Sequence, residues 1–180
     1  MGWNIYINGF KAYIRLEKSL STNSIDAYIR DVNKLAQFAA LNDLATCQSI
    51  TMEDVQSFLK YIAQLGLSPR SQARILSGIK AFYKYLLLEN EIKSDPTELI
   101  EAPKLGRKLP DTLSVEEVDI LINTIDRSTP EGERNKAILE VLYSCGLRVS
   151  ELINLKISNI YFNDSFIKIT GKGDKERLVP

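Results

Sequence analysis

The chain has 180 residues, of which 44% are hydrophobic and 26% charged, so an overall disordered chain is excluded. Its 23 Lys and Arg residues balance 23 Asp and Glu residues, so any nucleic-acid binding must come from local clusters of basic residues. The absence of His excludes His-dependent chemistry within these residues, and the two distant cysteines, Cys47 and Cys145, exclude a disulfide-rich fold and a paired-cysteine zinc site.

The N-terminal residues lack a basic segment followed by an apolar run, and no stretch approaches the roughly 18 apolar residues of a membrane span. We therefore expect a cytoplasmic protein that does not enter a membrane. Apolar and aromatic side chains recur at three- and four-residue steps from Trp3 to Lys18, which predicts the first helix.

Capping residues mark the next two helices. Either Ser21 or Thr22 can cap the free amides of a second helix, whose apolar face follows. Thr51 can cap a third helix, and Asp54 stands at the capping-box distance from it. We expect Gly66 to end this third helix.

A fourth helix is predicted to begin at Ser68 and Pro69, because a cap followed by proline is a typical helix start. It can continue to about Leu88, since Gly78 is the only breaker on the way. Asp95–Pro96 repeats the start signal and predicts a short final turn of helix. Residues 1–100 are therefore expected to form a compact domain of four to five helices.

Residues 101–112 are predicted to be an extended linker between domains. The part from Glu101 to Pro110 contains two prolines, one glycine and three basic residues, and it has no periodic apolar face. No acidic residue occurs from Ala102 to Pro110, so we expect the basic residues to follow a phosphate backbone; they are Lys104, Arg107 and Lys108.

Helical signals return in residues 113–180, the predicted second domain. Ser114 and Glu117 form a capping box that begins a helix. A further helix is expected from about Glu131 to Cys145, with Gly146 after its end, and a short one from Arg148 to Leu155.

After Leu155 the apolar pattern changes to short β-rich runs separated by turn residues, which predicts a meander of two or three strands. The predicted fold class is therefore mainly α with a small antiparallel β meander. A small sheet with one uncovered side makes an unstable end to a domain. We therefore expect the chain to be cut inside its second domain.

The fourth helix carries the main cluster of positive charge. From Val55 to Leu88 the chain has five basic residues and no Asp or Glu. At about 100° per residue, four of them fall within roughly a third of the circumference, opposite an apolar stripe; they are Arg70, Arg74, Lys80 and Lys84. A solvated amphipathic helix is one interpretation, but the lack of acidic partners favours contact with phosphate groups.

A second basic patch is predicted on the second helix. Arg30 and Lys34 are four residues apart and therefore share a face. It is the weaker candidate, because Asp26 and Asp31 lie beside these residues in the sequence.

Arg148 follows Gly146 at the start of a helix and is the first candidate for chemistry. We expect its side chain to be buried or half-buried there, where it would need an anion to offset its desolvation. An internal ion pair with Glu151, three residues later, is the alternative.

Lys172 lies between Gly171 and Gly173 in a predicted tight turn, whose backbone could come close to a ligand. A phosphate-binding P-loop is rejected, because that motif needs a Lys-Ser/Thr pair and a following helix, whereas here a strand follows. An ordinary charged hairpin turn remains the alternative.

Taken together, the helical first domain, the linker and the motifs Gly146–Leu152 and Gly171–Pro180 resemble the tyrosine recombinase/phage integrase family, and its Xer-type members in particular. The resemblance covers essentially the whole chain. It implies that residues 1–100 are a SAM-like, four-to-five-helix core-binding domain, and that residues 113–180 are the first half of an α+β catalytic domain.

The resemblance also implies roles for individual residues in site-specific DNA recombination through a 3′-phosphotyrosine intermediate, without metal or cofactor. Arg148 matches the arginine that clamps the scissile phosphate, Lys172 the lysine that protonates the leaving 5′ oxygen, and Glu151 an acid that supports the arginine. The implied partners are double-stranded DNA, further recombinase protomers in a tetramer, and a septal DNA translocase, in a role linked to chromosome partition and cell division.

One departure from the family pattern limits this expectation. The family's His-x-x-Arg box, a further His or Trp and the nucleophilic Tyr follow the strand meander, but these 180 residues contain no His and no Tyr after Tyr161. These 180 residues are therefore expected not to cleave DNA. Two other hypotheses remain: a noncatalytic DNA-binding or regulatory paralogue, and a helical module whose basic face binds an acidic protein.

Overall fold

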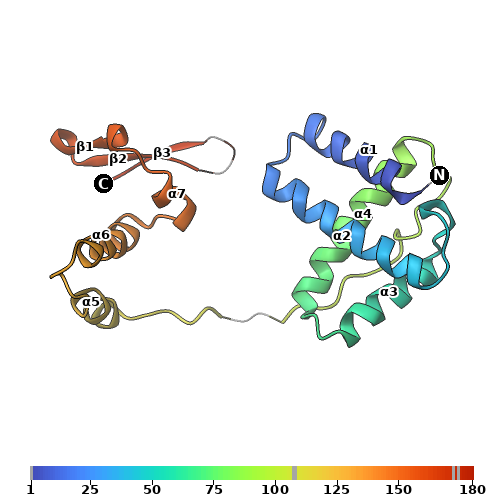
Figure 1. Ribbon diagram of the computed structural model, residues 1–180, viewed down its shortest axis with the longest axis horizontal. Helices are drawn as coiled ribbons and strands as arrows, with labels where there is room; N and C mark the ends of the chain where they lie inside the picture. Colours follow the sequence, from blue (N-terminus) through green and yellow to red (C-terminus); the bar gives the residue numbers. More distant parts are fainter. Residues whose placement is uncertain (1, 107–108, 172, 174) are drawn as a thin grey trace. The chain divides into compact units, whose positions relative to one another are not determined.

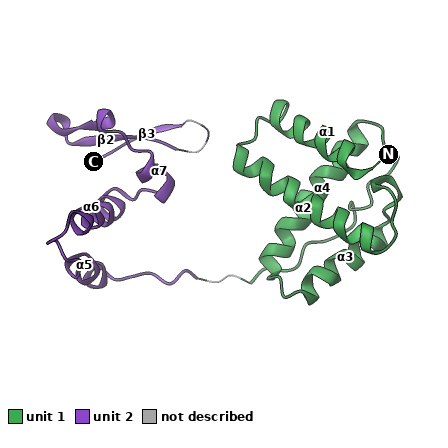
Figure 2. Ribbon diagram, viewed as in Figure 1, with its two compact units in different colours: residues 1–107 green, residues 108–180 purple. Residues whose placement is uncertain are grey.

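The computed structural model describes residues 2–106, 109–171, 173 and 175–180. They belong to two compact units, Met1–Arg107 and Lys108–Pro180 (Figure 2). Within the described residues, no helix has the length and apolar character needed to cross a membrane.

The first unit is helical, as the apolar periodicity of its sequence predicts. A short 3₁₀ helix, η1, joins the second and third of its α-helices (Figure 1). The bounds of the elements are α1 (Trp3–Leu16), α2 (Thr22–Leu41), η1 (Cys47–Ser49), α3 (Met52–Gln64) and α4 (Pro69–Leu88).

Most of the predicted caps are present in the first unit. The backbone N–H of Asp54 donates to Thr51 Oγ1 at 3.2 Å, and the Thr51 N–H donates to the Asp54 carboxylate at 2.8 Å, which completes the capping box. Ser68 caps α4 by accepting from the backbone of Ser71 at 3.3 Å. Ser21 occupies the cap position of α2 but makes no capping hydrogen bond with the helix.

The predicted final helical turn at Asp95–Pro96 is wrong: these residues begin a hydrogen-bonded turn, not a helix. Asp95 Oδ1 accepts from the backbone N–H of Thr97 at 2.7 Å and from its hydroxyl at 2.6 Å. The aspartate satisfies the amide of the next turn in the same way that it would cap a helix, so the start signal is real while the helix is absent.

The core of the first unit lies around α4, which α2 crosses (Figure 1). Phe82 packs edge-on against Phe10 with ring centroids 5.5 Å apart, and Trp3 stacks on Phe82 at 6.2 Å. A Cβ at Gly78 would lie 2.9 Å from that of Asp31, so this glycine allows α2 to approach α4 closely. The predicted apolar stripe of α4 is fully buried: Ile75, Leu76, Ile79, Phe82, Tyr83 and Leu86.

The second unit begins with three helices that follow the predicted signals. The backbone of Glu117 donates to Ser114 Oγ at 3.2 Å, and the Ser114 backbone donates to the Glu117 carboxylate at 2.8 Å, so the predicted capping box is present. Gly146 ends the second of these helices in the left-handed conformation, with φ of 56°. The helices are α5 (Val115–Asn123), α6 (Pro130–Cys145) and α7 (Val149–Ile153).

An antiparallel, three-stranded sheet in the order β1-β2-β3 follows, so the prediction of a β meander is confirmed. Its register places Ile167 opposite both Ile160 and Val179, and Ile169 opposite Arg177. The elements are η2 (Ile157–Asn159), β1 (Ile160–Tyr161), η3 (Phe162–Asp164), β2 (Phe166–Thr170) and β3 (Glu176–Val179).

The second unit buries few apolar side chains. Those that are buried among its described residues are Val118, Ile122, Leu147 and Ile169. Several larger ones are exposed, among them Ile120, Val149, Ile153, Ile157, Phe162 and Leu178. Helix caps, strand pairing and ion pairs are its other described contacts.

Candidate functional site

The predicted basic face of α4 is accessible to solvent. Arg70, Arg74 and Lys84 are exposed and Lys80 is half-buried, whereas the apolar stripe on the other side of the helix is buried. Ser68 and Pro69 begin the helix at the residues predicted for its start. The arrangement leaves these cations accessible to an anionic ligand.

Arg74 differs from the other cations of this face, because it pairs with an acid from another helix. Its Nη1 lies 2.6 Å from Oδ2 of Asp31 on α2, and the Asp31 side chain is only 2% exposed. The expectation of a basic face without acidic partners is therefore wrong at Arg74. Burial raises the pKa of the Asp31 carboxyl, against the lowering effect of Arg74.

Asp31 also corrects the interpretation of the second basic patch. Its side chain is buried toward α4 and does not lie on the surface beside Arg30 and Lys34, both of which are exposed. Arg30 Nε donates to the backbone carbonyl of Asp26 at 3.2 Å. One sequence signal could have revealed the burial of Asp31: it lies three residues after Tyr28 and four before Leu35, on the apolar face of α2.

The structure says little about the predicted site residues of the linker and of the glycine-flanked turn. Lys104 is exposed in a segment without helix or strand. Arg107, Lys108 and Lys172 lie outside the residues that the structure describes.

Arg148 occupies the N-cap position of α7, directly after the buried Leu147. The expectation that its side chain is buried or half-buried is wrong, because that side chain is 74% exposed. Its partner is buried instead: the Glu151 side chain is 4% exposed and accepts from Arg148 Nη1 at 3.0 Å. Glu151 also accepts from the Arg148 backbone N–H at 2.8 Å. The alternative interpretation, an ion pair between Arg148 and Glu151, is thus confirmed, and the pair leaves the Arg148 guanidinium accessible.

Arg177 on β3 completes this site and is not among the residues predicted from the sequence. Its Nη1 and Nη2 donate to the two carboxylate oxygens of Glu151 at 2.7 and 2.8 Å. Hydrogen bonds from Arg177 and from the Arg148 backbone lower the pKa of Glu151 to about 2. The signal for Arg177 is its strand position, since residues two apart share a face and the apolar Val179 follows two residues later.

Gly171 brings the end of β2 close to this carboxylate. A Cβ there would lie 3.3 Å from Glu151 Oε1, and the Gly171 N–H donates to the Lys175 carbonyl at 2.7 Å. The site therefore joins an exposed guanidinium to a buried, fully ionised carboxylate, an arrangement suited to holding an oxyanion. Among the described residues, no group of His, Cys, Asp and Glu is arranged to hold a metal ion.

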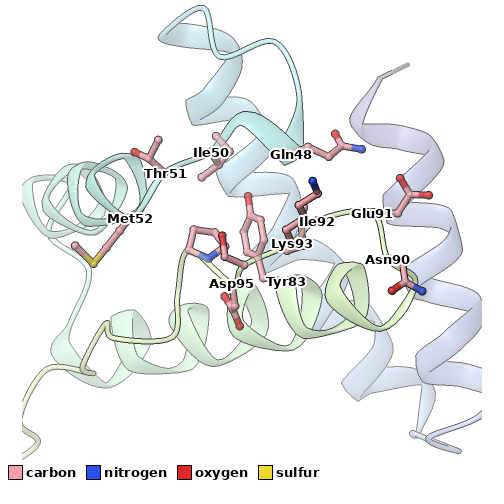
Figure 3. A pocket seen from close by; sticks show the side chains of 12 residues that line it. Gln48, Ile50, Thr51, Met52, Tyr83, Asn90, Glu91, Ile92, Lys93 and Asp95 are labelled. Atoms are coloured by element: carbon pink, nitrogen blue, oxygen red, sulfur yellow. The ribbon is translucent and has the colours of Figure 1, made fainter.

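The first unit also contains a cavity of about 640 Å³ beside the C-terminal end of α4 (Figure 3). Tyr83 lines it and donates its hydroxyl to the Cys47 carbonyl at 3.1 Å. Burial raises the pKa of Tyr83, so this phenol is un-ionised. The remaining lining mixes charges of both signs, including Glu91, Lys93 and Asp95.

In comparison with known proteins, both units match domains of phage integrases. Residues 7–90 match the N-terminal SAM-like domain of phage integrases, and residues 111–180 match the phage integrase family. The chain is 41% identical over 174 residues to tyrosine recombinase XerD of Staphylococcus saprophyticus. That alignment covers 97% of this chain and 59% of the relative, so the chain spans about three-fifths of that protein's length.

Two solved structures have the same fold. The XerH site-specific recombinase bound to a palindromic difH substrate is 23% identical, with a TM-score of 0.70 over 96% of this chain and 52% of that one. A lambda integrase tetramer bound to a Holliday junction is 16% identical, with a TM-score of 0.78 over 100% of this chain and 51% of that one. The predicted fold class, a helical SAM-like domain followed by helices and a small antiparallel sheet, is confirmed.

Proposed function

Because the chain belongs to the tyrosine recombinase (phage integrase) family, we propose that it takes part in site-specific DNA recombination, with strands cut and rejoined through a 3′-phosphotyrosine intermediate. The observation that carries this proposal is the exposed guanidinium of Arg148, held at the start of α7 by the buried Glu151. Residues 1–100 serve as the DNA-binding domain, 101–112 as the linker and 113–180 as part of the catalytic domain.

Arg148 contacts the scissile phosphate in this proposal. Nucleophilic attack on a phosphodiester adds charge to the equatorial oxygens of the pentacovalent phosphorus. A planar guanidinium can meet two of those oxygens with parallel hydrogen bonds, and its position is fixed before the reaction begins. Glu151 supports Arg148 and takes no part in the chemical step, because its carboxylate is already saturated by donors.

Lys172 acts as the general acid that protonates the leaving 5′ oxygen, which needs neither metal nor cofactor. The energy of the broken phosphodiester is conserved in the bond to a tyrosine. These 180 residues contain no His and no Tyr after Tyr161. We therefore expect them to bind DNA without forming the covalent intermediate.

DNA binding is assigned to basic residues of the first unit and the linker, and we expect the protein in the cytoplasm with the chromosome. The residues are Arg70, Arg74, Lys80, Lys84, Arg30, Lys34, Lys104, Arg107 and Lys108. A lambda integrase tetramer binds a Holliday junction. By analogy, this chain would act with further recombinase protomers on two DNA sites.

The test is the salt dependence of binding to a short duplex of mixed sequence. Replacing Arg70 and Lys84 with Ala should weaken binding and make the salt slope shallower by about two, because each lost phosphate contact changes the slope by about one. Replacing Lys11 and Lys60, which are exposed on α1 and α3, is the matched control and should leave the slope nearly unchanged.

Two results would contradict the proposal. Equal slopes for the two double variants would show that the basic face of α4 does not bind phosphates. Salt-independent or absent DNA binding would favour the acidic-protein partner instead. A denaturant-resistant adduct of the 180-residue chain with a nicked duplex would overturn the expected lack of covalent chemistry.

A further inference from the structure

Two arginines share one buried carboxylate in the second unit. Glu151 Oε1 accepts from Nη1 of Arg148 at 3.0 Å and from Nη1 of Arg177 at 2.7 Å. Its Oε2 accepts from the Arg148 backbone at 2.8 Å and from Arg177 Nη2 at 2.8 Å. Each oxygen therefore accepts one hydrogen bond from each arginine.

The two arginines use this carboxylate differently. Arg177 meets it with a two-point contact from the end of its guanidinium, the strongest geometry for such a pair. The side chain of Arg148 meets it through Nη1 alone, among the hydrogen bonds of the described residues. The Arg148 edge formed by Nε and Nη2 is left for another acceptor, and this side chain is 74% exposed whereas that of Arg177 is 37% exposed.

The net charge of the site also depends on Arg177. Two guanidinium groups and one carboxylate leave a net charge of about +1 at the site. If Arg177 were absent, Glu151 would be free to form a two-point contact with Arg148, and the pair would be neutral. Arg148 would then remain positioned but would lose much of its attraction for a phosphate.

We propose that Arg177 is a positioning residue for Arg148: by occupying both oxygens of Glu151, it limits Arg148 to a single-point contact and so preserves a free guanidinium edge and one positive charge for a phosphodiester. The inference rests on the proposed function, because it names the ligand of Arg148. It adds a residue on β3 that acts on the phosphate site only through Glu151.

The position of Arg177 in the sheet gives this contact a second consequence. Arg177 lies opposite Ile169 across the β2–β3 pair, and Gly171 ends the β2 side of the same hairpin next to Glu151. The Glu151 carboxylate therefore bonds the start of α7 to β3 and lies close to Gly171 at the end of β2. The two segments that carry the family's arginine and lysine motifs are joined by one carboxylate.

The experiment measures inorganic phosphate binding at Arg148 by following its Nε–H NMR signal in the 180-residue chain. Arg177→Met should weaken phosphate binding roughly tenfold. This is about the change in affinity expected when one charge-assisted hydrogen bond is lost. Arg177→Lys retains the charge but not the two-point contact. Its affinity for phosphate should therefore lie between those of the wild-type chain and Arg177→Met. The carboxyl signal of Glu151, followed from pH 6 to 3, should show a pKa that rises from about 2 toward its ordinary value of 4.5 in Arg177→Met.

Lys168→Met is the matched control. Lys168 is another cation of the sheet, and its Nζ lies 2.8 Å from Glu176, next to Arg177 in the chain. Its loss removes the same charge from the same unit without touching Glu151, so phosphate binding and the Glu151 pKa should change little. If Arg177→Met does not fold, Arg177→Lys provides the comparison.

The outcomes separate the inference from the proposed function. If phosphate shifts the Arg148 signal equally in the wild-type chain and in both Arg177 variants, Arg177 has no positioning role while the phosphate site stands. An equal loss in Lys168→Met would reduce the effect to general charge and would also overturn the inference. If phosphate leaves Arg148 unaffected in the wild-type chain, the proposed function of Arg148 fails and the inference fails with it.

Discussion

The two units bury their apolar side chains to very different extents. In the first unit, all four α-helices contribute fully buried side chains to one cluster around α4. In the second unit, the buried apolar residues are few, and large side chains such as Ile153 and Phe162 are more than 70% exposed. The described residues of the first unit therefore form a larger hydrophobic core than those of the second.

Each unit also contains a buried carboxylate, and the two behave in opposite ways. Asp31 makes one short contact with Arg74, and its Oδ1 has no hydrogen-bond partner among the described residues. Glu151 accepts hydrogen bonds on both oxygens from Arg148 and Arg177. Burial outweighs the single donor of Asp31 and raises its pKa, whereas the hydrogen bonds of Glu151 outweigh its burial and lower its pKa to about 2.

The largest effect is expected from opening the core of the first unit. Phe82→Ala should lower the free energy of unfolding of this unit by about 3–5 kcal/mol, since the ring is fully buried between Trp3 and Phe10. Trp3 is the only tryptophan, so denaturant unfolding followed by its fluorescence reports this unit. Phe162→Ala, at a 78% exposed site of the second unit, should change the stability of that unit by less than about 0.5 kcal/mol, as measured by its amide hydrogen exchange. Similar costs for the two variants would contradict the contrast between the units.

A smaller loss is expected at the Asp31–Arg74 pair. Arg74→Ala leaves a buried carboxylate without its partner and should cost about 1–3 kcal/mol, less than a fully buried pair because the Arg74 side chain is 51% exposed. Arg70→Ala, an exposed cation on the same helix, should cost less than about 0.5 kcal/mol.

Adding Asp31→Asn to Arg74→Ala should recover part of the loss, because it removes the unpaired charge; chemical denaturation of the single and double variants measures this coupling. If Arg74→Ala is as stable as Arg70→Ala, the pair contributes nothing to the packing of α2 on α4. Arg74 would then be an exposed cation of the basic face without a role in stability.

The smallest effect is a difference between the units in mild acid. A carboxyl whose folded pKa is lowered contributes stability above its unfolded value of about 4.5, and that contribution is lost as the pH falls toward about 2, which is the case for Glu151. A raised folded pKa has the opposite sign, so the contribution of Asp31 increases as the pH falls.

Amide hydrogen exchange between pH 5 and 2.5, corrected for intrinsic rates, should therefore show α7 and β3 losing protection before α2 and α4. Glu151→Gln should remove most of the pH dependence of α7 and β3. Loss of protection in α2 and α4 first would contradict the assignment of these pKa directions.

Local sequence signals were enough for the α-helices and the sheet that the two units contain. Capping boxes at Thr51–Asp54 and Ser114–Glu117 involve residues three apart, so the sequence alone places the helix starts. The apolar stripe of α4 likewise predicts its buried face, because helical periodicity decides which side chains share a side. The Asp95–Pro96 signal failed as a helix because the same capping chemistry also serves a turn.

The partners of the buried charges were decided only by the tertiary structure. Asp31 and Arg74 are 43 residues apart and meet where α2 crosses α4; Glu151 and Arg177 are 26 residues apart and meet where α7 lies against β3. No local pattern reports such a pair, because a carboxylate on an apolar face shows only that it needs a donor. Which donor the carboxylate meets depends on how the elements pack. The same packing leaves Arg148 exposed and buries Glu151.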